Sequence, residues 1–323
     1  MILSFSMARR SASSKFFAFV IYIFVCVLIG VAIFWITEKI ENSTKETVLV
    51  ADSSTASEVQ GVQMAQSPEP SATISPLGNA VMQALEGTKG EYAVGIKNLK
   101  TGEEYYLNEH KSFESGSLYK LWVMGETFRK VESGELMLED SLSATYASLN
   151  QTFNIDPENA EFTSGGITQS VAQALNQMIT ISHNGAAMLL TRENKTSTIK
   201  KWIEDHGFNE SEVGGEPKTS AHDMVKFFDD LQAGKLGNAE STEKMLKMLK
   251  DQRLNRKLPA DLPSNTVIAH KTGELGMFSH DAGIIYTPKG DYIIVVLSKS
   301  DTPAAAEKRI ADISKAVYDY FLK

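Results

Sequence analysis

The sequence predicts an α/β (α+β) fold in which an antiparallel five-stranded sheet is flanked by helices and joined to an all-helical lobe. Two observations support this prediction. Two β-rich segments come early in the globular part, three come late, and a long block of helical patterns lies between them. Short turns join neighbouring strands at both places, and strands joined by hairpins run antiparallel, which excludes a doubly wound parallel sheet.

The predicted strands are short runs of β-branched and aromatic residues bounded by turn residues. The early pair, "EYAVGIKNL" and "EEYYLNEH", is separated by a Lys-Thr-Gly tripeptide at residues 100–102, which is therefore read as a hairpin turn. The late strands are "NTVIAHKTG", "DAGIIYT" and "YIIVVLS", and "PKGD" joins the last two. A second Lys-Thr-Gly, residues 271–273, is thus predicted to end a strand.

The helical block begins at residues 117–134, where apolar residues keep helical spacing and Gly134 provides a stop. Thr168 is predicted to cap a helix with Val171, Leu175 and Met178 on its apolar face. Further helices are predicted at about 185–190, 197–205, 221–231, 242–249 and 303–321.

The N-terminal region predicts a membrane anchor. Residues 16–36 contain no charged side chain, and as a helix they would reach about 30 Å, enough to cross a bilayer core. Basic residues precede this run, so we expect a cytoplasmic tail (1–15), a transmembrane anchor (16–36), a disordered polar linker (37–76) and an extracytoplasmic globular domain (77–323) at the cell membrane. A cleaved signal peptide is the alternative, but its apolar region would usually be only about 7–15 residues long.

Composition excludes several classes of function. The net charge is −8, which argues against a nucleic-acid-binding surface. Cys26 is the single cysteine, so no intrachain disulfide is possible, and no Cys/His set has zinc-ligand spacing. We therefore expect a protein that uses neither a metal nor a cofactor. A monomer is also expected, although nothing in the composition determines the oligomeric state.

Three short motifs carry the chemistry. Ser117 and Lys120 share a helix face, so the lysine amine can remove the serine proton, and the first helical turn offers N–H groups to a developing oxyanion. Ser182 and Asn184 form Ser-x-Asn at a helix–helix junction, where capping alone would also explain both residue types. The third motif is the second Lys-Thr-Gly. Each is common by chance, and further Ser-x-x-Lys and Ser-x-Asn copies occur at residues 197–200, 241–244 and 148–150.

The order Ser-x-x-Lys, Ser-x-Asn, Lys-Thr-Gly resembles the active-site set of the class A β-lactamase and penicillin-binding-protein superfamily. The likeness extends to "MITISHNGAAMLLT" and "DAGIIYTPKGDYIIVVLS" and covers about residues 79–321. It implies a β-lactamase/transpeptidase-like fold and an acyl-enzyme mechanism.

The resemblance also implies roles for single residues. Ser117 would be the acylated nucleophile and Lys120 its activator, while Ser182 would pass a proton to the leaving nitrogen. Asn184 would orient Lys120 and the substrate amide. The substrate carboxylate would be held by Lys271 and Thr272, and the backbone N–H groups of Ser117 and Glu274, which follows Gly273, would form the oxyanion hole.

The sequence departs from the class A pattern in the Ω-loop, which normally carries the glutamate that activates the deacylating water. Its expected place is "GFNESEVGGEPKTS", which is short and has no Glu-x-x-x-Asn signature. Glu210, Glu212 and Glu216 are the available acids, and we read them as solvated loop residues. A deacylation base is therefore not identified.

Two single positions also differ from the class A pattern. His183 replaces the usual Asp and is read as structural. Ala282 occupies the place of a carboxylate-binding arginine. Nearby His280 could partly substitute for that arginine, but we read it as a satisfied surface histidine.

The sequence thus predicts a membrane-anchored serine hydrolase that acts by acyl-enzyme formation on β-lactams or related amides. Two alternatives remain open. One is a D-Ala-D-Ala-type cell-wall peptidase that deacylates slowly, and its substrate would be a peptidoglycan-like peptide. The other is a non-catalytic module that senses β-lactams or wall peptides.

Overall fold

The computed structural model describes residues 75–323, so the predicted tail, anchor and almost all of the predicted linker lie outside the described residues. The first described helix, α2, begins at Pro76, one residue before the predicted start of the globular domain. Within residues 75–323, no helix is both long and apolar enough to cross a bilayer.

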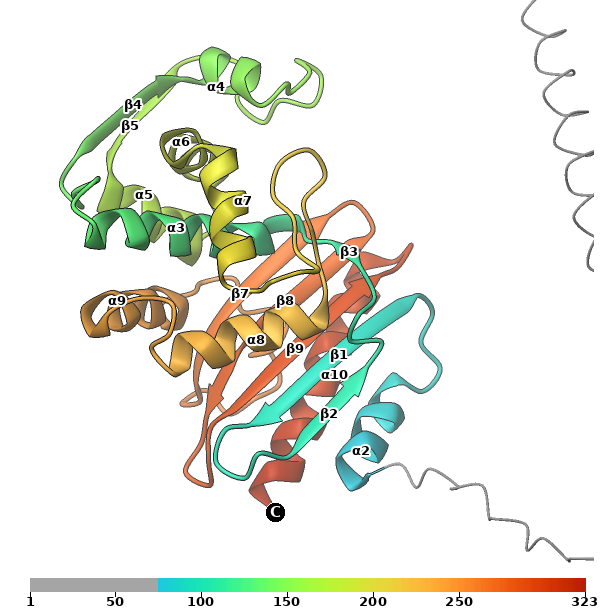
Figure 1. Ribbon diagram of the computed structural model, residues 1–323. Coiled ribbons are helices and arrows are strands. Elements are labelled where there is room, and N and C mark those ends of the chain that lie inside the picture. The colour runs from blue at the N-terminus through green and yellow to red at the C-terminus, as the bar shows by residue number, and fades with distance from the viewer. Residues whose placement is uncertain (1–74) are drawn as a thin grey trace, which may run out of the picture. The chain divides into compact units, whose positions relative to one another are not determined.

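The antiparallel five-stranded sheet is confirmed, with strand order β2-β1-β9-β8-β7. The early hairpin forms its β2 edge, and the late strands form the other three positions (Figure 1). The turn between the first two strands contains the first Lys-Thr-Gly, as predicted. The strands are β1 (Glu91–Asn98), β2 (Glu104–Leu107), β7 (Val267–Leu275), β8 (Phe278–Tyr286) and β9 (Tyr292–Lys299).

Helices cover both faces of this sheet (Figure 1). On one face, α2 (Pro76–Leu85) and α10 (Pro303–Leu322) pack together and enclose one apolar cluster with the strands. On the other face, α8 (Ala221–Gln232) packs on β1 and β9 and belongs to a larger cluster shared with the second lobe. The central strands β8 and β9 are buried along almost their whole length because both of their faces are covered.

The second lobe is mostly helical, but the prediction that it is all-helical is wrong. Strands β4 (Ser141–Thr145) and β5 (Gly166–Ser170) pair antiparallel within it. Each has a single buried apolar residue, Leu142 in β4 and Ile167 in β5, so the segments alternate with the period of a half-buried strand. The lobe's helices are α3 (Lys120–Glu132), α4 (Tyr146–Thr152), α5 (Val171–Thr180), α6 (Asn184–Asn194), α7 (Thr196–Asp205) and α9 (Ala239–Lys250).

The antiparallel pair of β4 and β5, here called the β4–β5 ribbon, contains Thr168, so the predicted cap of α5 is wrong. Thr168 lies inside β5, where its hydroxyl is 2.8 Å from that of Ser143 across the strand pair. Ser170 is the actual cap, and it forms a reciprocal capping box with Gln173. The helix itself begins at Val171, two residues later than a cap at Thr168 predicts, and it contains the predicted apolar residues Val171, Leu175 and Met178.

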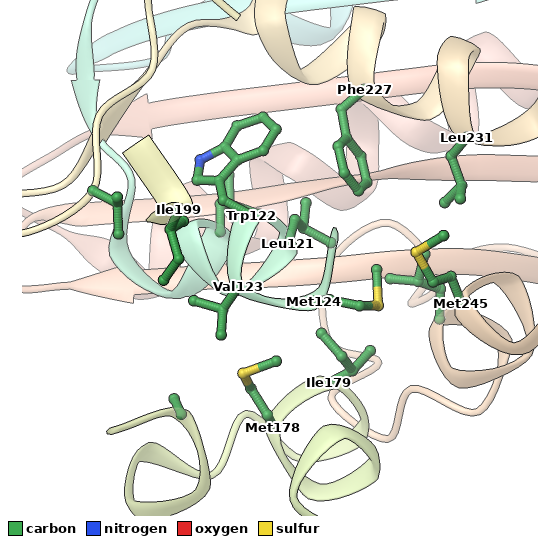
Figure 2. Close-up of a cluster of buried hydrophobic side chains, with 14 of the residues drawn as sticks. Leu121, Trp122, Val123, Met124, Met178, Ile179, Ile199, Phe227, Leu231 and Met245 are labelled. Atoms are coloured by element: carbon green, nitrogen blue, oxygen red, sulfur yellow. The ribbon is translucent and has the colours of Figure 1, made fainter. Parts of the chain in front are cut away.

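Helix α3 lies at the centre of the second lobe, where it contacts α5, α6, α7 and α9. Every residue from Lys120 to Phe128 is buried, as expected for a helix that neighbours surround on all sides. Figure 2 shows side chains of α3 and of its neighbours, and the rings of Trp122 in α3 and Phe227 in α8 lie with centroids 5.2 Å apart in an edge-to-face arrangement. A rigid, buried α3 fixes the position of the residues that precede it, including Ser117.

Candidate active site

Ser117 lies in a 3-10 turn, η1 (Gly116–Tyr119), immediately before α3 rather than within the α-helix. Two glycines allow this turn to lie directly against β7. A Cβ on Gly116 would be 2.7 Å from the backbone nitrogen of Glu274, and one on Gly273 would be 2.6 Å from the carbonyl oxygen of Ser115. Any larger residue at either position would push the serine away from the strand that carries the predicted oxyanion donor.

Ser182 and Asn184 lie at the junction of α5 and α6, as predicted. The residue that caps α6 is His183, whose Nδ1 accepts a hydrogen bond from the backbone nitrogen of Ala186 at 3.1 Å. The capping explanation for Ser182 and Asn184 is therefore wrong, and the structural reading of His183 is confirmed. Ser182 has a positive φ of 57°, a backbone conformation that often occurs at functional sites.

Lys120 is completely buried and donates hydrogen bonds into this junction. Its Nζ lies 2.6 Å from Asn184 Oδ1, 2.6 Å from the Ser182 carbonyl oxygen and 3.1 Å from Ser182 Oγ. Burial lowers the pKa of Lys120 to about 7, against the opposing effect of the negative charge of Glu161. About half of the molecules therefore carry a neutral amine at pH 7, which is the form that can act as a base.

Lys271 approaches the same hydroxyl from the sheet. Its Nζ donates to Ser182 Oγ at 3.0 Å and to the Thr272 carbonyl oxygen at 2.8 Å. Burial and the nearby charge of Lys120 hold the pKa of Lys271 well below its usual range. Because Ser182 Oγ accepts from both lysines, its own proton is left to donate, and it can transfer that proton to a leaving nitrogen.

A cavity of about 200 Å³ brings five of the predicted site residues together. Its lining residues are Ser117, Ser182, Asn184, Leu254, Thr272 and Glu274. The edge strand β7 forms one wall, and it continues to Leu275, so the prediction that Gly273 ends the strand is wrong by two residues. The extension follows from pairing, because Glu274 and Leu275 still oppose residues of β8.

A second cavity of about 410 Å³ shares Asn184 with the first. It is lined by the segment between α4 and β5 and by four residues of the loop between α7 and α8, which are Val213, Gly214, Gly215 and Pro217. Apolar side chains such as Phe153, Ile155 and Phe162 are part of its lining, so the cavity suits a hydrophobic group of a ligand.

Sequence reasoning missed Glu161, which also lines the second cavity. Its Oε2 accepts a hydrogen bond from Asn184 Nδ2 at 2.6 Å, while the amide oxygen of Asn184 accepts from Lys120. The carboxylate is thus linked to the buried lysine through one amide. Nothing in the surrounding segment, "NIDPENAEFTSGG", forms a motif, so the sequence offered no signal for this contact.

The three loop acids considered in the sequence lie away from both cavities. The reading of Glu210 as a solvated loop acid is wrong, because it is half-buried and hydrogen-bonded to His110 and Ser220. Glu212 and Glu216 are exposed, as expected, and none of the three lines either cavity. The same loop therefore contributes cavity-lining residues but no carboxylate to the site.

The prediction of a surface position for His280 is wrong, because its side chain is fully buried. Its Nε2 lies 2.8 Å from the Glu114 carbonyl oxygen, and its Nδ1 accepts from the backbone of Ser298. Burial lowers the pKa of His280 to about 4, so the ring is neutral at pH 7 and has no charge to offer a substrate carboxylate. Ala282 at the arginine position is also buried.

The chain is similar to known proteins across the whole described domain. A family model described as "Beta-lactamase enzyme family" matches residues 76–321. The beta-lactamase VEB-1 of Pseudomonas aeruginosa is 24% identical over 269 residues, covering 75% of this chain and 89% of that protein. The extended-spectrum beta-lactamase PER-1 of the same organism is 24% identical over 279 residues, with 79% and 90% covered.

Solved structures share the fold. A beta-lactamase from Sphaerobacter thermophilus has a TM-score of 0.67 at 24% identity and covers 76% of this chain and 96% of its own. The structure of PBP-A has a TM-score of 0.68 at 21% identity, with 77% and 97% covered. A variant of PBP-A, described as an acyl-enzyme complex with penicillin G, has a TM-score of 0.68 at 21% identity, with 76% and 96% covered.

Proposed function

The chain belongs to the beta-lactamase enzyme family, and from that premise we propose that it is a serine hydrolase that forms an acyl-enzyme on Ser117 with β-lactams or related amides. The observation that supports this most directly is the hydrogen-bonded set behind the nucleophile. Two buried lysines, Lys120 and Lys271, donate to the single hydroxyl of Ser182 beside the cavity that contains Ser117.

In the proposed acylation step, neutral Lys120 takes the proton of Ser117 as its Oγ attacks the substrate carbonyl. The N–H groups of Ser117 and Glu274 stabilise the oxyanion, since Gly116 holds the nucleophile turn against this part of β7. The amide bond then breaks as Ser182 gives its proton to the leaving nitrogen. Lys120 returns a proton to Ser182, so the acyl-enzyme forms without any external acid.

Deacylation is the step for which the site offers least support. Water must attack the ester, and losing a positioned general base costs about 10²–10⁴-fold in rate. The loop between α7 and α8 brings Val213, Gly214, Gly215 and Pro217 to the larger cavity, and its three acids lie elsewhere. Glu161 also lines this cavity, and its carboxylate accepts a hydrogen bond from Asn184. We propose that Glu161 does not activate the deacylating water, so that a β-lactam acyl-enzyme of this protein is released slowly.

Slow release favours a second candidate function, a D-Ala-D-Ala-type peptidase whose natural substrate is a cell-wall peptide. The two candidates share the acylation half of the reaction and differ in what happens to the acyl-enzyme. One fold neighbour, the PBP-A variant in complex with penicillin G, is described as an acyl-enzyme, which is the state we propose for this chain after reaction with a β-lactam.

The test uses the full-length chain, purified in detergent, mixed with benzylpenicillin and followed by intact mass. We expect a lasting adduct on the parent protein, none on Ser117→Ala, and an unchanged adduct on Ser197→Ala. The last variant is the matched control, because it removes the exposed serine of another Ser-x-x-Lys sequence on α7. A parallel assay measures release of D-alanine from a peptide ending in D-Ala-D-Ala.

Each outcome separates the candidates. A lasting adduct together with D-alanine release supports the peptidase, and a lasting adduct without release supports a β-lactam sensor. Rapid turnover of penicillin without an adduct would show an efficient β-lactamase and contradict slow release. If neither an adduct nor turnover of penicillin is observed, the proposed acylation of Ser117 by β-lactams is refuted.

We also propose that residues 16–36 anchor the chain in the cell membrane with the catalytic domain outside the cytoplasm. The support is the uncharged run and the basic residues before it. The parent chain should stay in the membrane fraction after carbonate washing, whereas a variant lacking residues 1–36 should not. An N-terminus that begins after residue 36 in the mature protein would instead identify a cleaved signal peptide.

A further inference from the structure

Three side chains from distant parts of the sequence meet outside the cavity that contains Ser117. His110 lies in the turn after β2, Glu210 in the loop between α7 and α8, and His222 is the second residue of α8. One ligand atom from each lies within 4.8 Å of the others. We propose that this His110–Glu210–His222 cluster binds a zinc-class divalent cation that fastens the loop between α7 and α8 to the sheet domain.

The distances suit a tetrahedral transition metal. His110 Nδ1 is 2.8 Å from Glu210 Oε1, and His222 Nδ1 is 3.9 Å from Glu210 Oε2. Ligands bound to zinc at about 2.0–2.1 Å are separated by roughly 3.3 Å at tetrahedral angles, which lies between the two values. Two histidines and a glutamate are a known zinc ligand set with a fourth position open to water.

The surroundings of Glu210 hold its carboxylate in place. Ser220 donates a hydrogen bond to Oε2 of Glu210, and the backbone nitrogen of Glu210 donates to Asp223 Oδ2 at 2.9 Å. The backbone nitrogen of His222 donates to the Glu109 carbonyl oxygen at 3.0 Å, which connects α8 to the turn that carries His110. Such outer contacts orient metal ligands before the ion arrives.

His222 gives an independent reason to expect a ligand. Its Nδ1 is a buried atom that makes no well-formed hydrogen bond among the described residues, since the nearest acceptor, Asp223 Oδ1, is 3.5 Å away, although polar atoms in such positions are nearly always satisfied. The side chains of His110 and His222 are 63% and 45% exposed, so an ion can enter from solvent. Two carboxylates close by, Asp223 at 3.5 Å from His222 Nδ1 and Glu109 at 4.0 Å from His110 Nε2, also favour a cation.

The proposed metal site would affect the larger cavity, because the loop between α7 and α8 forms part of its wall. Residues 213–217 of the same loop include four that line the larger cavity, and Glu210 precedes them by only a few positions. A bound ion would join three separate segments at one point and reduce the motion of that cavity wall. This role is structural, so it does not depend on the proposed acylation chemistry.

The test is zinc binding by the full-length chain, purified without a histidine tag and freed of metal with a chelator. We expect one zinc ion per chain by isothermal titration with zinc chloride, with affinity falling at least tenfold in His110→Ala and in Glu210→Gln. Glu212→Gln is the matched control, because Glu212 is an exposed acid of the same loop outside the cluster. Its affinity should equal that of the parent.

Hydrogen exchange provides the second readout. Zinc should slow exchange in residues 207–217 of the parent and of Glu212→Gln but leave His110→Ala unchanged. His110 is mostly exposed, so this variant keeps the fold intact. Absence of stoichiometric zinc binding, or binding that His110→Ala and Glu210→Gln both leave unaltered, would overturn the proposal.

Discussion

Acylation of Ser117 should accelerate with rising pH and reach half of its maximum rate near pH 7. The reason is that Lys120 must be neutral to accept the serine proton. Burial lowers the pKa of Lys120 from 10.5 to about 7, so about half of the molecules are competent at pH 7. At the ordinary lysine pKa, only about one molecule in three thousand would have a neutral Lys120 at pH 7.

Replacing Glu161 with Gln tests how the charge of Glu161 affects the pKa of Lys120, because this charge opposes the effect of burial. Two hydrogen bonds of 2.6 Å and the amide of Asn184 lie between the charges of Glu161 and Lys120. Their separation is therefore at most roughly 7 Å, which corresponds to about 0.6 kcal/mol in a water-like dielectric. Water screens the exposed carboxylate of Glu161 whereas Lys120 is buried, so this value is the smallest attraction expected. Losing the attraction should move the midpoint of the profile down by at least about half a pH unit. At pH 6, Glu161→Gln should therefore be acylated at least about two to three times faster than the parent.

The assay is rapid-quench acylation by benzylpenicillin between pH 5 and pH 9, read by intact mass. The amide oxygen introduced by Glu161→Gln can still accept the hydrogen bond of Asn184, and Glu158→Gln is the control because it removes an exposed acid of the same segment. A midpoint that stays in place or rises would refute the action of Glu161 on Lys120. A rate independent of pH would refute Lys120 as the base. An acyl-enzyme that lasts a hundredfold longer in Glu161→Gln would make Glu161 the deacylation base.

Three further predictions concern the scaffold. Gly116→Ala should slow acylation by about 100-fold or more without abolishing folding, because a Cβ would lie 2.7 Å from the nitrogen of Glu274; unchanged kinetics would contradict this oxyanion site. Buried His280 resists protonation, so about 3 kcal/mol of unfolding free energy should be present above pH 6.5 and be lost as the pH falls towards 4. In urea denaturation, the fall in unfolding free energy between pH 7.5 and pH 4.5 should be smaller in His280→Gln than in the parent by about 3 kcal/mol. An equal fall in the two proteins would contradict the lowered pKa of His280. Ser170→Ala should cost about 1 kcal/mol in the same assay, whereas a neutral effect would argue against the capping box.

Sequence patterns recovered the sheet because its strands are short, β-branched and joined by turns, and these are local properties. They failed at the β4–β5 ribbon, where each strand has one buried apolar residue and the pattern is too weak to compete with the helices around it. They also misjudged His280, since nothing local distinguishes a buried histidine from an exposed one. Burial at that position comes from contacts with Glu114 and Ser298.

The residues of the candidate site also include some that the sequence predicted and one that it did not. The order of the three motifs identified Ser117, Lys120, Ser182 and Asn184 together with the second Lys-Thr-Gly, and the structure brings all of them to one cavity or directly behind it. Glu161 escaped detection because it belongs to no motif and reaches the site only through Asn184. Its partner follows it by 23 residues, with β5 and α5 between them.

The sequence by itself determined which chemical groups this protein has and in what order, because nucleophile, base and strand motifs are written in neighbouring residues. Only the tertiary structure decided the positions and protonation states of these groups. Lys120 and Lys271 meet Ser182 from 62 and 89 residues away, and complete burial of both amines lowers their pKa. Burial and proximity arise from the packing of distant segments, so the availability of a neutral lysine at pH 7 is a property of the fold.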